Sequence, residues 1–448
     1  MGGKESADMT SRVLCLKVQI LLSKGLLDEA ISLSESFRSR HPACFDVNAA
    51  LVDLYHKTAQ FDRAEALIGN LRPNSLEQRQ RYLRVCGDCA LAQYDIPAAE
   101  SFYQELVDLQ AAFADKAKNL IRTLQLHLMK GDIPKATCQA QILDSSYNLP
   151  VRDRMRKFYA VLLSEFGKFP RLIEEMSSIR HLSLSEQYDR LLTIVADAPY
   201  GCPAAMTVLT AARRLSIWER ETPQVCSGLE HQIPRRIVQF WDKADLPEEI
   251  GTTTATWKRQ CAGFTHILFN DGSANEFIRQ HCSVDTWRAF KAARQPTMRS
   301  DIFRLAYLYE CGGIYADADD LCRRDIAPLF EDGYSLLLLQ EYIGSIGNNF
   351  IAAAPKHPWL KRVLGGLVAR VLERPNDNIW FTTGPGALSH CFCQFYLDDL
   401  RGRRLPVGMR LLDVFRVSRY VSVALPLHYK ATDHWTSSDS RLSCQSTT

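Results

Sequence analysis

The sequence predicts two parts, an all-α region of stacked helix pairs followed by an α/β domain. Over the first 180 residues glycine is sparse, and apolar residues recur at spacings of three and four, as in amphipathic helices. From about residue 230 onward, short β-like runs alternate with helical patterns, which is typical of an α/β sheet domain. The length of 448 residues agrees with two or three domains, and a hydrophobic content of 46% is ordinary for a globular protein.

A short signature returns along the helical region. It stands at Gly25–Ala30, Gln60–Ala64, Tyr94–Ala99, Gly131–Ala136 and Gly167–Leu172. Ala30 and Ala64 are 34 residues apart, and so are Ala64 and Ala98. A permissive turn followed by a small residue where two helices cross explains the pattern, which resembles the tetratricopeptide repeat. Stacked helix pairs of another kind are the alternative.

We predict four segments. They are helical repeats at 1–195, a linker at 196–232, an α/β domain at 233–436 and a polar, disordered tail at 437–448. The linker prediction rests on "DAPYGCP" and "ETPQVCSGLEHQIP", which are rich in proline, glycine and polar residues. Strands are expected at 235–241, 264–270, 314–319 and 335–342, and helices at 302–311 and 358–373.

Composition narrows the classes of function. A formal net charge of +3 gives no argument for a nucleic-acid partner. The fourteen cysteines are scattered with one CxxC pair, Cys86 and Cys89, so buried reduced thiols are expected rather than a zinc site. We recognise no signal peptide and no transmembrane segment, which favours a cytoplasmic location. The opening "MGGKES" fits the myristoylation pattern at Gly2, so peripheral membrane attachment is the alternative.

The stretch "GGIYADADD", Gly312–Asp320, carries the chemistry. Crowded carboxylates are costly unless a cation or substrate neutralises them. We expect Asp317 and Asp319 to point the same way, because side chains alternate along a strand. Two carboxylates at the end of a strand can hold Mg²⁺ or Mn²⁺, which would neutralise the diphosphate of a nucleotide sugar. The preceding helix places Asp301 and Arg304 on one face.

Other interpretations of this stretch are a solvated acidic loop and carboxylates that cap a helix after Leu321. A phosphatase of the haloacid-dehalogenase type also places DxD at a strand end. Its motif has Thr or Val two residues after the second Asp, where this chain has Leu321. That departure argues strongly against a phosphatase.

The block "SDIFRLAYLYECGGIYADAD" resembles the DXD-motif glycosyltransferases with a sugar-binding region (family 32 type), which include α-mannosyltransferases and are related to the glucosylating clostridial toxins. Weaker elements follow the family order from "IPRRIVQFW" through "NNFIAAAPKHP" and "TTGPGAL" to "LHYKATDHW", so the resemblance covers residues 233–435. It implies a GT-A fold, which is a Rossmann-like α/β sandwich, and retention of the anomeric configuration.

The resemblance also implies roles for single residues. The catalytic group would be Asp301, Arg304, Asp317 and Asp319. The donor-binding residues would be Trp241, Asp301, Arg304, Tyr315, Asp317, Asn348, Asn349 and Trp435. The Mn²⁺ or Mg²⁺ ligands would be Asp317, Asp319 and His428. Core packing is the alternative for Tyr315 and Trp241, and Val238 stands where the family often has His. Asp320 could be a third ligand, a helix cap or a residue without function.

We therefore predict a retaining, metal-dependent glycosyltransferase that moves a sugar from a UDP- or GDP-sugar to a glycan or protein acceptor in surface polysaccharide synthesis. One alternative is an effector-like protein glycosyltransferase whose target is recruited by the repeats, because solenoids offer extended concave surfaces. The other is a non-catalytic scaffold with a decayed transferase domain. The presence of Asp301, Arg304 and Asp319 argues against decay.

Overall fold

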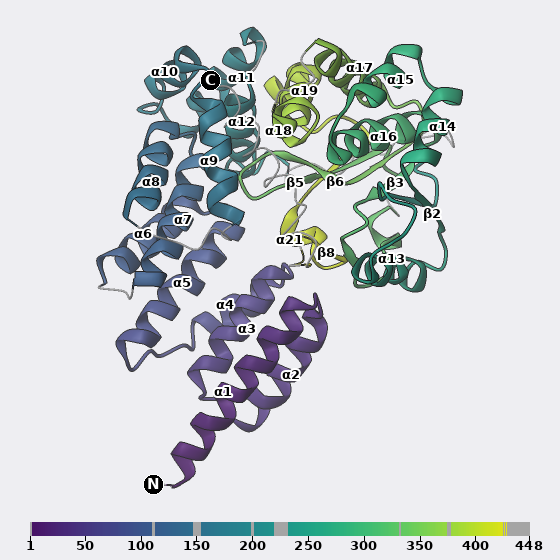
Figure 1. The fold of residues 1–448 in the computed structure, drawn as a ribbon. Helices are drawn as coiled ribbons and strands as arrows, with labels where there is room; N and C mark the ends of the chain where they lie inside the picture. The colour runs from purple at the N-terminus through teal and green to yellow at the C-terminus, as the bar shows by residue number, and fades with distance from the viewer. Residues whose placement is uncertain are drawn as a thin grey trace.

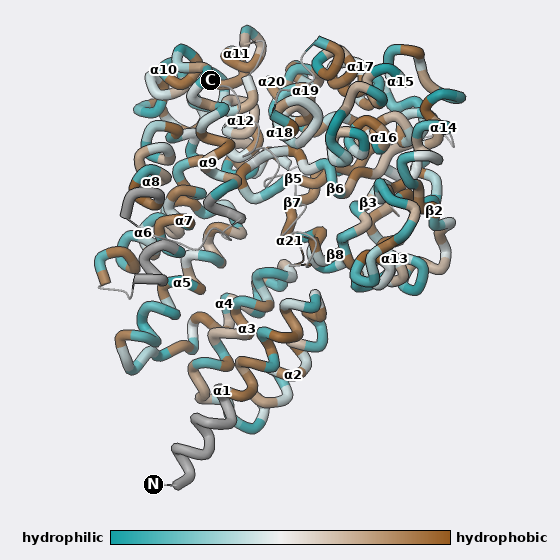
Figure 2. Tube along the Cα trace, in the orientation of Figure 1, coloured by the Kyte–Doolittle hydropathy of each residue, from teal (hydrophilic) through white to brown (hydrophobic). Residues whose placement is uncertain are grey.

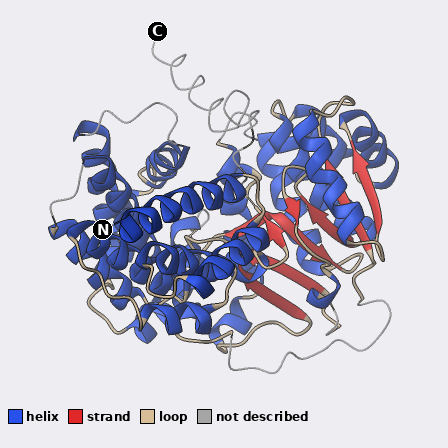
Figure 3. Cartoon of the chain, turned by 90° about the horizontal axis from the view of Figure 1, so that it is seen from below, coloured by secondary structure: helices blue, strands red, loops and turns tan. Residues whose placement is uncertain are grey.

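The computed structural model describes residues 2–109, 113–146, 154–198, 201–218, 232–330, 333–373, 378–423, 425 and 427. A helical half, α1 to α12, lies beside an α/β half built around one main sheet (Figure 1). Seen from below, the strands of that sheet run side by side, to the right of the helical half that carries the N-terminus (Figure 3). Within these ranges, no helix is both long and apolar enough to cross a membrane.

The helical half is a succession of helices in which chain neighbours pack together. They are α1 (Gly2–Ser23), α2 (Leu27–Arg40), α3 (Phe45–Lys57), α4 (Phe61–Ile68), α5 (Leu76–Ala92), α6 (Ile96–Asp108), α7 (Phe113–Met129), α8 (Ile133–Ser146), α9 (Arg154–Phe166), α10 (Pro170–Ser178), α11 (Leu184–Asp197) and α12 (Cys202–Arg214). The predicted all-α character of this region is confirmed, and its assignment to a tetratricopeptide-like solenoid stays a prediction.

The repeated signature lies at the turn before the second helix of each pair. Its first four turns contain a residue with positive φ, namely Gly25, Ala59, Tyr94 and Gly131. The small residue that follows is fully buried at Ala30, Ala64 and Ala136, where neighbouring helices cross. In the third pair the buried residue is Ala99 rather than Ala98, so the second step, which starts at Ala64, is one residue longer than predicted.

The segment 196–232, expected to be a linker, contains α12. This helix is buried along its whole length, and it packs against α11 and α19 (Pro385–Phe395). Arg213 near its end donates hydrogen bonds to the side-chain oxygen of Gln340 (2.8 Å) and to the carbonyl oxygen of Leu411 (2.6 Å). The expected loop is therefore wrong for residues 202–214. Most of these residues are alanine or apolar and favour a buried helix, and the proline lies in the first turn, where a helix tolerates it.

The main sheet of the described residues has six strands in the order β2-β1-β3-β6-β5-β7. All neighbours are parallel except β6, which is antiparallel to β3 and β5. The strands are β1 (Arg236–Phe240), β2 (Thr265–Phe269), β3 (Gly313–Ala316), β5 (Leu336–Gln340), β6 (Ile346–Ala353) and β7 (Met409–Asp413), and β4 (Leu321–Cys322) pairs with β8 (Val421–Ser422) in a second ladder.

Helices cover both faces of the sheet, and alternate strand residues point to each face. Val238, Tyr315 and Ile351 belong to the core under one set of helices, whereas Ile237 and Ile314 pack toward α13 (Glu248–Gln260). The first set, above the sheet in Figure 1, includes α14 (Asp271–His281), α15 (Val284–Ala292), α16 (Pro296–Cys311), α17 (Pro358–Glu373) and α19. Figure 2 shows hydrophobic residues along β5 and β7, as expected for strands buried on both faces.

Three short helices complete the α/β half: α18 (Ile379–Thr382), α20 (Leu397–Arg401) and α21 (Val414–Val417). The last of these carries Phe415, whose ring meets His56 and Phe61 of the helical half. Nearby, Arg323 and Arg324 each form an ion pair with Asp28 at 2.7 Å. The two halves are therefore joined by both apolar and charged contacts.

The sheet topology defines one edge as the place for a site. Because β1, β3, β5 and β7 run the same way, their carboxyl ends meet at one edge, and β6 begins there. Asp317 follows β3, and Asn348 and Asn349 lie in the first half of β6. Ligands of open α/β sheets bind outside the carboxyl ends of their strands.

Candidate functional site

The DADD segment forms a turn and not the end of a strand. β3 ends at Ala316, and the N–H of Asp320 donates to the carbonyl oxygen of Asp317 at 3.1 Å. The prediction that Asp317 and Asp319 share one face of a strand is therefore wrong. The chain leaves the main sheet at this point to reach β4, so the alternation of a strand does not extend over these residues.

A tight reversal brings α16 against β3. Gly312 and Gly313 have φ of 65° and 112°, which side chains rarely adopt. A Cβ at Gly312 would lie 2.8 Å from Pro355, and one at Gly313 would lie 2.7 Å from the carbonyl oxygen of Arg236. Both glycines are thus required for the close approach that places α16 beside the strand.

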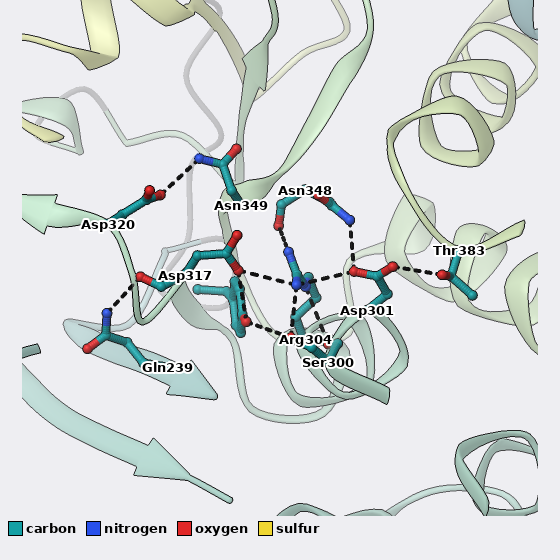
Figure 4. A network of polar contacts seen from close by, with 10 residues as sticks. Gln239, Ser300, Asp301, Arg304, Asp317, Asp320, Asn348, Asn349 and Thr383 are labelled. Atoms are coloured by element: carbon teal, nitrogen blue, oxygen red, sulfur yellow. Dashed lines mark hydrogen bonds and ion pairs between the residues drawn. The ribbon is translucent and has the colours of Figure 1, made fainter. Parts of the chain in front are cut away.

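Arg304 of α16 lies between two carboxylates at the sheet edge (Figure 4). Its Nη2 is 3.2 Å from Asp301 Oδ1 and 3.3 Å from Asp317 Oδ1. Nη2 also donates to Ser300 Oγ at 2.8 Å, and Nη1 donates to the carbonyl oxygen of Asn348. The side chains of Arg304 and Asp301 are 4% and 1% exposed, so the pair is almost completely withdrawn from water.

Asp301 is held on its other sides by neutral donors. Asn348 Nδ2 donates to Oδ1 at 2.8 Å, and Thr383 Oγ1 donates to Oδ2 at 2.7 Å. Thr383 is 82 positions away in the chain and enters the site just before α19. It was not among the predicted site residues, although it lies in the "TTGPGAL" element on which the resemblance partly rests.

Tyr315 belongs both to the core and to this cluster. Its side chain is 1% exposed, and its ring centroid lies 4.4 Å from the guanidinium carbon of Arg304. Its hydroxyl donates to Asp317 Oδ1 at 3.2 Å and lies 2.9 Å from Ser300 Oγ. The hydroxyl therefore extends the polar network to the carboxylate that begins the DXD motif.

Gln239 of β1 supports the turn from the other side. Its Nε2 donates to the carbonyl oxygen of Asp317 at 3.0 Å, so its Oε1 is left to accept from His266 Nε2 at 2.6 Å. Burial lowers the pKa of His266 to about 4, and nearby Lys258 acts in the same direction. A neutral His266 on β2 thus fixes the Gln239 amide, and neither residue was predicted.

The electrostatics of the cluster follow from burial and close charges. Burial raises the pKa of Asp301 to about 7, against the opposing effects of Arg304 and of the Thr383 hydroxyl. Burial acts to lower the pKa of Arg304, but Tyr315 and the carboxylates of Asp317 and Asp301 raise it overall. Arg304 therefore keeps its charge at any working pH, and Asp301 gains a proton more readily than an ordinary carboxyl group.

Of the remaining predicted site residues, four lie at or near this edge of the sheet and two lie outside the described residues. Trp241 is half-buried directly after β1, at the same edge, and its backbone N–H donates to the carbonyl oxygen of Phe269 at 2.9 Å. Asp319 is partly exposed within the turn. Asn348 and Asn349 both join the polar network. His428 and Trp435 lie outside the described residues.

The carboxylates fit a hard divalent cation in donor type. Within the described ranges, no three His, Cys, Asp or Glu side chains gather in a group able to hold a metal ion. Asp317 and Asp319 supply oxygen donors, which Mg²⁺ and Mn²⁺ prefer, and Mg²⁺ is commonly bound by one or two carboxylates together with substrate phosphates. A two-carboxylate site that substrate completes is thus compatible with this turn.

Comparison with known proteins adds an independent line. Residues 247–336 match the family described as "Glycosyltransferase sugar-binding region containing DXD motif". The chain is similar to inositol phosphoceramide mannosyltransferase 1 of Schizosaccharomyces pombe, with 30% identity over 178 residues, 38% of this chain and 54% of that protein. It is also similar to mannosyl phosphorylinositol ceramide synthase CSH1 of Saccharomyces cerevisiae, with 29% identity over 36% of this chain and 43% of that protein. The matches thus span about half the length of these relatives.

Among solved structures, the chain is similar to one described as PaToxG Glycosyltransferase. The two share 14% sequence identity, and the match covers 54% of this chain and 96% of that chain with a TM-score of 0.32.

Proposed function

We propose, on the premise that residues 247–336 form the sugar-binding region of a DXD-motif glycosyltransferase, that the α/β half transfers a hexose from a nucleotide sugar to an acceptor hydroxyl. The observation that carries the proposal is the buried Asp301–Arg304 pair, which also meets the partly exposed Asp317 at the carboxyl edge of the sheet. In this reading the α/β half is of the GT-A type, and the sugar retains its anomeric configuration.

The described residues divide the work of holding a donor. Asn348 and Thr383 hold the buried Asp301 carboxylate in one orientation beside Arg304. Asp317, whose side chain is 30% exposed, would accept hydrogen bonds from hydroxyls of the donor. Trp241 offers a large rigid face on which a base can stack. Asp317 and Asp319 would hold Mn²⁺ or Mg²⁺, which supplies positive charge against the departing diphosphate.

Sugar and acceptor are proposed from the relatives. Their names specify mannose transfer, so a mannose donor is the first candidate for this chain. The same names mention an inositol phosphate lipid, which is therefore a candidate acceptor in addition to the glycan and protein acceptors predicted from the sequence. The helical half is proposed as the surface that recruits an acceptor or a protein partner, because repeat solenoids present extended binding surfaces.

The direct test is donor hydrolysis by the full chain. UDP-glucose, UDP-galactose, UDP-N-acetylglucosamine and GDP-mannose are incubated with and without Mn²⁺, and the released nucleotide is measured. We expect release from one donor that depends on Mn²⁺ and disappears with chelator. Calorimetric titration with the matching nucleotide diphosphate should show binding that requires the metal. If no donor is hydrolysed and no nucleotide binds in the presence of Mn²⁺, the proposed activity is wrong.

A further inference from the structure

The turn after β3 is fixed by hydrogen bonds from α13. Thr253 Oγ1 donates to the carbonyl oxygen of Ala318 at 2.6 Å, and Trp257 Nε1 donates to the carbonyl oxygen of Asp320 at 2.8 Å. Both donors are buried, with Trp257 fully so. α13 therefore acts as a rigid backing for the DADD turn as well as a cover for the sheet.

Asp320 differs from the other two carboxylates of this segment. Asp320 is only 3% exposed, whereas the side chain of Asp317 is 30% exposed and Asp319 is partly exposed. Its Oδ2 accepts a hydrogen bond from Asn349 Nδ2 at 3.0 Å. A buried carboxylate that faces an amide donor is poorly placed to serve as an exposed metal ligand.

Asn349 is held to the same turn at two points. Its side-chain amide donates to Asp320, and its backbone carbonyl oxygen accepts from the N–H of Asp317 at 2.9 Å. Figure 4 shows the amide nitrogen turned toward Asp320 and the amide oxygen turned away from it. An ionised carboxylate can only accept, so Asp320 selects this orientation of the amide over the flipped one.

The space beside the amide oxygen is also kept open. Gly347 is two residues earlier on β6 and therefore on the same face. A Cβ built at Gly347 would lie 3.1 Å from Asn349 Oδ1, which is closer than most real Cβ contacts. The absence of a side chain at Gly347 thus leaves room for the oxygen in the orientation that Asp320 imposes.

We infer that Asp320 is a positioning residue, which fixes the Asn349 amide so that its oxygen is presented to the sugar-nucleotide donor. The inference rests on the proposed transferase function and adds a specific role to it. Asp317 and Asp319, both partly exposed, are left as the carboxylates that would meet the metal. This answers the question that the sequence leaves open about the third acid of the DADD segment.

The experiment compares Asp320→Asn, Asp320→Ala, Asn349→Ala and the double variant Asp320→Ala/Asn349→Ala in the full chain. Asparagine at 320 can still turn an oxygen to Asn349, so Asp320→Asn should keep kcat and the donor KM within about threefold of wild type. Asp320→Ala loses the bond and should raise the donor KM about tenfold. A tenfold change in KM corresponds to about 1.4 kcal/mol.

The double variant provides the decisive readout. If Asp320 acts through Asn349, the double variant should be no worse than Asn349→Ala alone, in donor KM and in the Kd of the nucleotide diphosphate measured by calorimetry with Mn²⁺. Additive losses would overturn the inference. So would an Asp320→Asn variant that weakens Mn²⁺ activation as severely as Asp319→Ala, because that result would make Asp320 a metal ligand.

Failure of the proposed function gives a different result. In that case wild type itself shows no donor hydrolysis and no metal-dependent nucleotide binding, whatever happens at position 320. The coupling between Asp320 and Asn349 would then be measured by chemical denaturation of wild type, Asp320→Ala, Asn349→Ala and the double variant. Additive stability losses there would overturn the positioning role, and Asp398→Ala, at a 96% exposed side chain, serves as the control for a lost surface carboxylate.

Discussion

Two arginine–carboxylate pairs, one in each half of the molecule, differ strongly in burial. In the helical half, Arg79 of α5 pairs with Glu105 of α6 at 2.6 Å, with both side chains more than 40% exposed. In the α/β half, Arg304 and Asp301 are almost fully buried, and Asp301 also accepts hydrogen bonds from Asn348 and Thr383. An exposed pair between neighbouring helices adds little stability, whereas a buried ion pair at a sheet edge is costly, and this cost supports our proposal that the cluster serves function.

The largest expected effect is on activity. Asp319→Ala should lower kcat/KM for the donor by at least about 100-fold, since removing one preorganised charge-stabilising group commonly has effects of this size. The melting temperature of the metal-free protein should stay near that of wild type, because Asp319 is partly exposed in a turn. Donor hydrolysis and thermal melting check the two halves of the statement. A protein that unfolds instead would show that the carboxylate is structural.

The second expected effect is on stability. Arg304→Ala leaves Asp301 buried without its cation, and loss of one partner of a buried pair costs about 3–5 kcal/mol. The matched control is Arg79→Ala in the helical half, where loss of the exposed pair with Glu105 should cost at most about 1 kcal/mol. Urea denaturation of both variants gives the comparison directly. Equal losses would mean that burial does not separate the two pairs.

The third prediction concerns pH. Because burial raises the pKa of Asp301 to about 7, the native state binds its proton more tightly than the unfolded chain does. The stabilisation is fully present below the ordinary carboxyl range near pH 4 and is lost as the pH rises to about 7, at about 1.4 kcal/mol per pH unit at most. Unfolding free energies of wild type and Asp301→Asn should therefore diverge in this window in favour of the variant. A constant difference between them would contradict the raised pKa.

The smallest effects compare two helix-interior glycines. At Gly87 in α5, a Cβ would lie 2.3 Å from the buried Tyr103 ring, so Gly87→Ala should destabilise the helical half by about 1–3 kcal/mol. At Gly365 in α17, no atom lies within 4 Å of the added Cβ, so Gly365→Ala should stabilise the protein by about 0.5–1 kcal/mol. Thermal melts that move in the same direction for both variants would contradict the packing argument.

Much of the α/β half follows from local pattern. The expected strands at 235–241, 264–270 and 335–342 each contain an observed strand, and the helix at 358–373 has the bounds of α17. The error lies at the DADD segment, where polar residues follow a strand without continuing it. Whether the chain stays in the sheet after Ala316 depends on the hydrogen bond from α13 to Ala318 and on the pairing of β4 with β8, which alternation alone does not reveal.

The sequence by itself determined the two halves and the positions of the repeated turns, because periodicity is a local property of the chain, and its resemblance to the DXD-motif glycosyltransferases predicted Asp301, Arg304, Asp317 and Asp319 as one group. Only the tertiary structure decided that α12 is part of a core, that Thr383 reaches Asp301 and that Asp320 faces Asn349. Asp320 and Asn349 are 29 positions apart, and Asp301 and Thr383 are 82 positions apart. Such contacts depend on how the elements pack, and the local sequence does not specify them.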